Sequence, residues 1–212
     1  MASLFEQLAR AVIDGNNKVT PQLVSQAFQE GISAEDVLNK GLLAGMEEVG
    51  RLFKAEEYYV PEVLLSARAM RAAMEVLRPA LVKSGVEPKG RVALGTVKGD
   101  LHDIGKDLVG MMLEGGGYQV KDLGRDVAPR DFVEAALSGE VQVVGLSALL
   151  TTTMENMRAT IKALEESGAR EKVKVIVGGA PVTEAYAEEI GADGYGEDAV
   201  SALEKVKELI GA

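Results

Sequence analysis

Apolar residues recur every three or four positions through residues 1–83, which is the repeat of an amphipathic helix. Shorter helices are predicted over residues 3–13 and 21–30, each followed by a glycine. Two longer stripes follow, one formed by Leu38, Leu42, Met46, Val49 and Phe53, and one formed by Leu64, Ala67, Met70, Met74 and Leu77. Four helices with short connections predict a small helical bundle over residues 1–86.

The pattern changes after the linker SGVEPKG at residues 84–90. Short segments rich in Val and Ile then alternate with amphipathic stretches, the last of which covers 199–210. The expected strands are Arg91–Val97, Tyr118–Leu123, Val141–Ser147, Val173–Val177 and Asp193–Tyr195. Strands that alternate with helices predict right-handed βαβ units and a parallel sheet covered on both faces. The α/β class follows, with a five-stranded flavodoxin-like or Rossmann-like domain of strand order 2-1-3-4-5 over residues 87–212.

Composition narrows the function classes. The net charge of −10 argues against a nucleic-acid partner, which requires a basic face. No apolar run is long enough for a membrane span, and MASLFEQLAR lacks the features of a signal peptide. The chain has no cysteine, which excludes disulfides and thiolate metal sites. A cytoplasmic protein without membrane or nucleic-acid contacts is expected.

The single histidine, His102, lies in VKGDLHDIG, directly after the first predicted strand. Open parallel sheets bind ligands beyond the carboxyl ends of their strands, so this loop is a candidate site. Asp100 is near enough in sequence to accept the Nδ1 proton and leave Nε2 free for a metal. A zinc site needs three or four ligands, whereas haem or a cobalt corrinoid brings most of its own. A surface or structural histidine is the alternative.

A phosphoacceptor receiver domain has the same predicted fold. Such a domain requires an Asp at the end of the third strand and a Lys at the end of the fifth. Here the third strand ends in Ser147 and the fifth in GYGED, so both requirements fail.

Three short motifs give a resemblance to a known family. Residues 100–105 read D-x-H-x-x-G, Ser147 to Leu149 read S-x-L, and Gly178-Gly179 follow, with the spacing of cobalamin-binding domains. Residues 46–70 also resemble the helical cap that precedes this domain in methionine synthase. The whole chain is most similar to the small corrinoid proteins of methyltransferase systems.

The resemblance implies a role for each motif residue. His102 is implied to be the metal ligand, on the lower face of cobalt in cobalamin or a related corrinoid. Asp100 and the hydroxyl of Thr153 are implied to complete a catalytic proton relay with it. The implied cofactor-binding residues, besides Asp100, His102 and Thr153, are Asp103, Ile104, Gly105, Ser147, Leu149, Gly178 and Gly179 near the nucleotide tail, and Phe53 and Val60 over the upper corrin face. Taken alone, Gly178-Gly179 is also typical of a strand-to-helix turn.

The function implied by the resemblance is a methyl carrier. Cobalt(I) takes a methyl group on a substrate-specific methyltransferase, and methyl-cobalt(III) passes it to tetrahydrofolate or coenzyme M on an acceptor methyltransferase. The chain is then the corrinoid subunit of a multi-component system, inactive alone, and a reductive activation protein is a further candidate partner. The donor stays open among methanol, methylamines and methoxylated aromatics. The alternatives are a cobalamin-dependent sensor or regulator, a detached mutase domain, and a storage protein.

Overall fold

The computed structural model describes residues 2–211, so Met1 and Ala212, the outer ends of the two predicted domains, lie outside it. These residues divide into two compact units, one formed mainly by residues 2–88 and the other by most of 89–211. The helical unit contains α1 (Leu4–Ile13), α2 (Val19–Gln29), α3 (Ala34–Asp36), the π-helical turn η1 (Val37–Leu43), α4 (Ala44–Lys54) and α5 (Val60–Ser84). No helix within residues 2–211 is long and apolar enough to span a membrane.

The predicted stripes form the core of the helical unit. Buried residues of α5 and of the continuous segment α3–η1–α4 include Leu42, Met46, Met70 and Leu77. The π-helical turn was not predicted, because the four-residue steps between Leu38, Leu42 and Met46 also fit an α-helix. The ends of both early helices agree with prediction to within two residues, and Ser3 caps α1 by accepting a hydrogen bond from Glu6 N–H.

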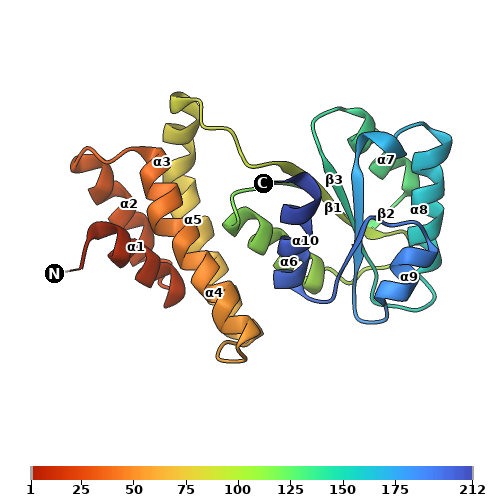
Figure 1. The fold of residues 1–212 in the computed structure, drawn as a ribbon, viewed down its shortest axis with the longest axis horizontal. Coiled ribbons are helices and arrows are strands. Elements are labelled where there is room, and N and C mark those ends of the chain that lie inside the picture. Colours follow the sequence, from red (N-terminus) through yellow and green to blue (C-terminus); the bar gives the residue numbers. More distant parts are fainter. Residues whose placement is uncertain (1, 212) are drawn as a thin grey trace. The chain divides into compact units, whose positions relative to one another are not determined.

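The second unit is a parallel sheet with helices on both faces (Figure 1). Its elements are β1 (Arg91–Val97), α6 (Ile104–Gly115), β2 (Gln119–Val127), α7 (Pro129–Leu137), β3 (Val143–Ser147), α8 (Glu155–Glu166), the 3₁₀ turn η2 (Arg170–Lys172), β4 (Lys174–Gly178), α9 (Glu184–Glu189), β5 (Gly194–Gly196) and α10 (Ala199–Ile210). The strand order is β2-β1-β3-β4-β5. Helices α6 and α10 cover one face, and α7, α8 and α9 cover the other. The predicted fold, a helical bundle followed by a five-stranded parallel sheet, is confirmed.

Strand β2 differs most from its prediction, because it continues four residues beyond Leu123 to Val127. The extra segment, Gly124–Val127, contains the exposed polar pair Arg125 and Asp126 and a single buried apolar residue, Val127, so the apolar pattern could not reveal it. Backbone pairing holds it instead, through an irregular register in which Gly95 lies opposite Gly124 and Val97 opposite Val127. This extension carries β2 alongside the loop that contains His102.

Candidate functional site

The three sequence motifs meet at the carboxyl edge of the sheet. Thr96 pairs with Ser147 across β1 and β3, and Ser147 pairs with Gly178 across β3 and β4. Because all the strands are parallel, the loops that follow these residues leave the sheet on the same side. Motifs that are 41 and 28 residues apart in the chain therefore contribute to one site.

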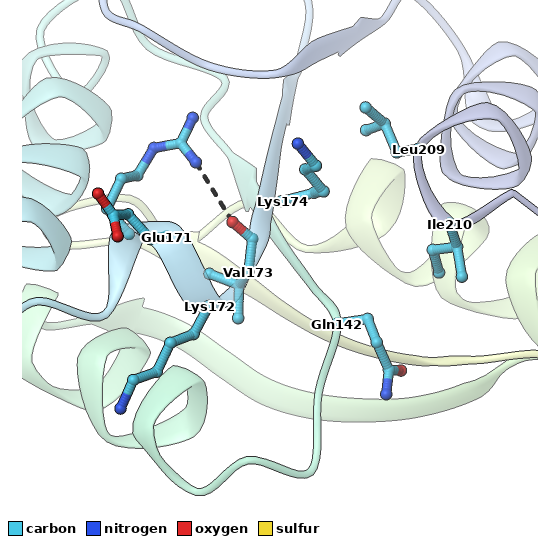
Figure 2. Close-up of a pocket in the computed structure, with 8 residues that line it drawn as sticks. Gln142, Glu171, Lys172, Val173, Lys174, Leu209 and Ile210 are labelled. Atoms are coloured by element: carbon cyan, nitrogen blue, oxygen red, sulfur yellow. Dashed lines mark hydrogen bonds between the residues drawn. The ribbon is translucent and has the colours of Figure 1, made fainter.

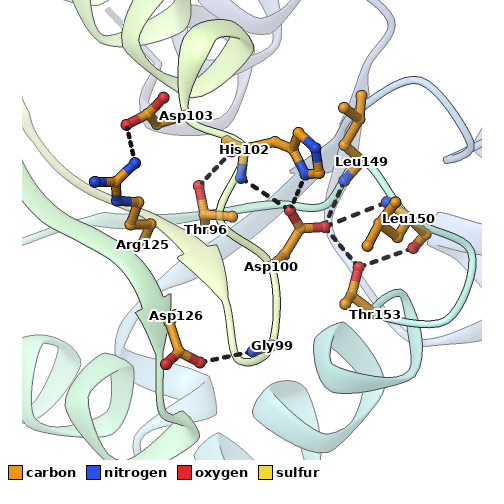
Figure 3. A network of polar contacts seen from close by, with 10 residues as sticks. All are labelled: Thr96, Gly99, Asp100, His102, Asp103, Arg125, Asp126, Leu149, Leu150 and Thr153. Atoms are coloured by element: carbon orange, nitrogen blue, oxygen red, sulfur yellow. Dashed lines mark hydrogen bonds and ion pairs between the residues drawn. The ribbon is translucent and has the colours of Figure 1, made fainter.

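His102 is held through its backbone and through one ring nitrogen (Figure 3). Its Nδ1 lies 2.7 Å from Asp100 Oδ1, and its backbone N–H donates to the same oxygen at 3.0 Å. Its carbonyl accepts a hydrogen bond from Thr96 Oγ1. The side chain stays half-exposed. The ring therefore has a fixed orientation, with Nδ1–H as donor to the carboxylate and Nε2 available to a ligand.

Asp100 is fully buried and collects donors from two loops. Its Oδ1 accepts both His102 bonds, while its Oδ2 accepts the N–H groups of Leu149 and Leu150 at 2.8 and 3.2 Å. The Thr153 hydroxyl lies 2.6 Å from Oδ2 and 2.8 Å from the Leu150 carbonyl, with one proton to donate between these acceptors. Both carboxylate oxygens are thus saturated without a cationic side chain.

These contacts determine the protonation state of Asp100. Burial by itself raises the pKa of the carboxyl group, because it removes water from the charged form. Hydrogen bonds from the Thr153 hydroxyl, the His102 and Leu149 backbone and the His102 ring outweigh that effect and lower the pKa well below its ordinary range. The carboxylate is therefore a constant negative partner for the imidazole at neutral pH.

The glycines of the site differ in what requires them. A Cβ on Gly179, which has a φ of +127°, would come within 1.9 Å of the Ala148 carbonyl oxygen, and one on Gly178 within 2.7 Å of the Gly196 carbonyl oxygen. Close backbone packing is sufficient to explain both glycines, in agreement with the alternative of a strand-to-helix turn. A Cβ on Gly105 would meet nothing within 4 Å, although this residue lies in the first turn of α6. Protein packing therefore does not explain this glycine, since open space surrounds its Cβ position.

Four other predicted cofactor residues are exposed or half-buried. Asp103 pairs with Arg125 at 3.4 Å, and Ile104 is 79% exposed. Phe53, on α4, is half-buried, and Val60, at the start of α5, is exposed. The cofactor roles of these four residues stay predictions.

Leu150, Thr96 and Asp126 also hold the loop and were not predicted, because their contribution is geometric. Leu150 and Asp126 donate backbone N–H groups to Asp100, and Thr96 supports the loop through the His102 carbonyl. A hydrogen bond from a backbone N–H group has no residue-type signature in the sequence. The one signal in the sequence was the position of Thr96 next to the end of β1, where parallel sheets place their ligand sites.

A pocket of about 320 Å³ lies at the opposite edge of the sheet, where β3 and β4 begin (Figure 2). Gln142, Lys172 and Lys174 line it together with Leu209 and Ile210 of α10. Arg170, also in its wall, is paired with Asp193 at 2.7 Å. This ion pair ties η2 to the segment before β5, so the charge of Arg170 serves the fold there.

Comparison with known proteins identifies the family of the domain that contains His102. Two family models, both described as a B12 binding domain, match residues 90–204 and residues 4–78. A corrinoid protein of Desulfitobacterium hafniense (strain Y51) is 41% identical over 212 residues, covering 99% of this chain and 98% of the relative. The chain belongs to the B12-binding corrinoid proteins.

This corrinoid protein has further relatives in methyltransferase systems. Dimethylamine corrinoid protein 3 of Methanosarcina acetivorans is 42% identical over 207 residues, covering 98% of this chain and 97% of the relative. The solved methanol:cobalamin methyltransferase complex of Methanosarcina barkeri matches with a TM-score of 0.87 at 30% identity, covering 99% of this chain and 80% of that one. The predicted cofactor class, cobalamin or a related corrinoid, is confirmed.

The residues around His102 fit a large, mostly apolar metal macrocycle. Four apolar side chains here are between 42% and 79% exposed: Leu101, Ile104, Leu149 and Leu150. The first two are close to His102 in sequence, and the last two donate their backbone N–H groups to Asp100. No group of three or more His, Cys, Asp or Glu side chains within residues 2–211 is arranged to hold a metal ion. One oriented imidazole, exposed apolar side chains and the open space at Gly105 suit a metal whose other ligands come with the cofactor.

Proposed function

We propose that this corrinoid protein is a methyl carrier that binds cobalamin base-off, with His102 as the lower ligand of cobalt. Methyl groups enter from a substrate-specific methyltransferase and leave on an acceptor methyltransferase that uses tetrahydrofolate or coenzyme M. The observation that carries the proposal is the His102 ring, whose Nδ1 is committed to buried Asp100 while the side chain stays half-exposed. The relatives named for dimethylamine favour methylamines as donors.

When bound, the corrinoid supplies a cobalt centre that accepts and releases a methyl group. The chain's own residues regulate the ligand on that centre. His102 Nε2 offers its lone pair, and Asp100 fixes the ring tautomer from the other side. The Asp100 carboxylate also gives the imidazole a fixed negative partner. Thr153, with Leu149 N–H and Leu150 N–H, keeps that carboxylate charged and in place.

In this proposal residues 1–86 form the cap and residues 87–212 the cobalamin-binding domain. Phe53 and Val60 shield the upper corrin face, while Gly105, Ser147, Leu149, Gly178 and Gly179 line the channel for the nucleotide tail, with Asp103 and Ile104 at its entrance. In a carrier of this kind, activation of the methyl donor and of the acceptor takes place on separate proteins. Turnover then requires both methyltransferases, and a reductive activation protein is a further partner.

Gly105→Ala should lower the cobalamin affinity without lowering the stability of the fold. The added methyl group meets no protein atom, so the ligand-free stability should change by less than about 1 kcal/mol. The same methyl group would occupy space proposed for the cofactor, and the cobalamin affinity should fall about tenfold, in the range of overpacking costs. Titration of the ligand-free chain with cobalamin, followed by absorption, measures the affinity.

Gly110→Ala is the matched control for Gly105→Ala. It lies on the same helix, and its Cβ would make an ordinary 3.5 Å contact with Leu94. It should leave the cobalamin affinity unchanged. Equal affinities for both variants and the wild type would remove Gly105 from the cofactor site.

Phe53→Ala should expose the upper face of the cofactor. An apolar cover returns the methyl radical to cobalt after photolysis, so methylcobalamin on the wild-type chain should photolyse several-fold more slowly than the free cofactor. The variant should lose most of this protection and keep its affinity, since Phe53 is only half-buried. Val76→Ala, which changes an exposed residue of α5, is the control. Equal photolysis rates for wild type and Phe53→Ala would contradict the cover.

The carrier function is tested by reconstitution. Cobalamin-loaded chain is incubated with mono-, di- and trimethylamine, methanol and a methoxylated aromatic compound, alone and with the methyltransferases encoded beside its gene. Methyl transfer to tetrahydrofolate or coenzyme M is expected only when a donor and an acceptor enzyme are both present. Substantial turnover by the isolated chain would contradict a carrier. Failure with every partner, despite bound cobalamin, would favour storage or sensing.

A further inference from the structure

The end of β2 contacts the histidine loop at three points, and Figure 3 shows two of them, Asp126 with Gly99 and Arg125 with Asp103. Asp126 Oδ1 accepts the Gly99 N–H at 2.7 Å, and the Asp126 N–H donates to the Asp100 carbonyl at 3.0 Å. Beside it, Arg125 pairs with Asp103 at 3.4 Å. The two Asp126 bonds hold the backbone at Gly99 N–H and at the Asp100 carbonyl, independently of the bonds made by the Asp100 carboxylate.

The backbone of Asp126 has an unusual conformation, which allows it to make these contacts. Its φ is +54°, and within residues 2–211 only Glu56, with a φ of +59°, is another non-glycine residue with a positive φ. Asp and Asn tolerate this left-handed region better than other residues, because their short polar side chains bond locally. Here the side chain bonds to Gly99, which is itself left-handed with a φ of +80°. The residue type thus suits both the conformation and the acceptor role.

We propose that Asp126 is a positioning residue for His102: it clamps the Gly99–Asp100 backbone from β2, so that the Asp100 carboxylate keeps the imidazole in one orientation. The consequence for cobalt rests on the proposed role of His102 as its ligand. The clamp itself is a property of the ligand-free chain and can be measured there.

Packing does not account for Asp126. Its side chain is exposed, whereas its neighbour Val127 is buried in the core of the sheet domain. A substitution at position 126 therefore removes no apolar burial. A strained left-handed backbone persists only where other interactions stabilise it. At Asp126 these interactions are its hydrogen bonds to Gly99 and Asp100.

Three variants separate the backbone from the carboxylate. Asp126→Asn keeps both the left-handed tolerance and an acceptor oxygen. Asp126→Gly keeps the conformation without strain and loses the acceptor. Asp126→Ala loses both. Glu56→Gly is the control, since it relieves the same backbone conformation in the helical unit.

Nuclear magnetic resonance of the ligand-free chain reads the result without ambiguity, because His102 is the only histidine. In wild type and Asp126→Asn, the ring ¹⁵N shifts should report one tautomer with the proton on Nδ1. In Asp126→Gly, the two shifts should move toward each other as both tautomers are populated. The Gly99 amide should exchange at least about tenfold faster, as expected for loss of a hydrogen bond to a charged group.

The proposal would be overturned if Asp126→Gly kept the wild-type ring shifts and Gly99 exchange, or if Asp126→Asn lost them as fully as Asp126→Gly. Equal changes in Glu56→Gly would also overturn it, because they would indicate a general loosening. If Asp126→Ala does not fold, the Asn and Gly variants still decide. Failure of His102 to ligate cobalt in the wild type would refute the proposed function and leave these ligand-free results standing.

Discussion

The His102→Ala variant is expected to fold like the wild type and yet to hold cobalt without a nitrogen ligand from the protein. The ring is half-exposed, so its removal creates no core cavity. Asp100 keeps the His102 backbone N–H, the Leu149 and Leu150 N–H groups and the Thr153 hydroxyl as donors. The ligand-free stability should therefore fall by about 1 kcal/mol at most.

Cobinamide in the cobalt(II) state is a suitable probe, because it lacks the nucleotide base and any coupled nitrogen must come from the protein. Its electron paramagnetic resonance spectrum on the wild type should show nitrogen coupling, and His102→Ala should abolish it. Reconstituted methyl transfer should fall by more than about 100-fold, since replacing even the partner of a metal ligand costs 10- to 100-fold. Lys98→Ala, an exposed change in the same loop, should alter neither. Nitrogen coupling that survives in His102→Ala would contradict the assignment of the ligand.

Asp100→Asn is expected to be the most destabilising isosteric change in the site. The new amide NH₂ group must face either the two Leu N–H groups and Thr153, or the His102 N–H and ring, and each environment contains at least one backbone N–H that can only donate. Buried donors without an acceptor cost about 1–3 kcal/mol each, so the free energy of unfolding should fall by about 2–4 kcal/mol. Thr153→Val, which removes one donor and leaves the carboxylate, should cost about 1–2 kcal/mol. Urea unfolding of the ligand-free wild type and of the two variants measures these differences in the free energy of unfolding.

The pH dependence gives Asp100→Asn a second signature. The pKa of Asp100 is lower in the folded chain than in the unfolded one, so the unfolded chain takes up the proton first as the pH falls. The stabilisation by the carboxylate is complete above the unfolded pKa, about 4, and is lost progressively below it. The stability difference between wild type and Asp100→Asn should therefore narrow from about pH 5 downward. A constant difference down to pH 2 would contradict the ionised, hydrogen-bonded carboxylate.

Patterning predicted the fold because each unit repeats one physical signal. Leu42 and Met46 of one stripe and Met70 and Leu77 of the other are buried, and the alternation of strands and helices led to the observed strand order. The signal fails where backbone pairing replaces apolar burial, as in the polar end of β2 at 124–127. It also fails for charged residues: Lys106 is 4% exposed because Asp107 and Asp122 lie 2.6 and 2.7 Å from its Nζ.

The site was predictable where side chains carry the chemistry. The two-residue spacing of Asp100 and His102 predicted their contact, and the structure has it at 2.7 Å. The resemblance, not the spacing, supplied Thr153, whose hydroxyl lies on the same carboxylate. The backbone donors of Leu149 and Leu150 and the left-handed Asp126 required three-dimensional information, since they depend on where loops from β1, β2 and β3 meet.

Ligation of the cobalt of bound cobalamin by His102 can be measured directly, because the chain has a single histidine. The wild-type chain is prepared with ¹⁵N-labelled histidine and unlabelled cobalamin, reduced to cobalt(II), and compared with the unlabelled sample by electron paramagnetic resonance. If His102 is the ligand, the nitrogen coupling changes from triplets to doublets on labelling. Triplets that persist in the labelled sample, as the cofactor's own base would give, or no nitrogen coupling in either sample, would contradict ligation by His102.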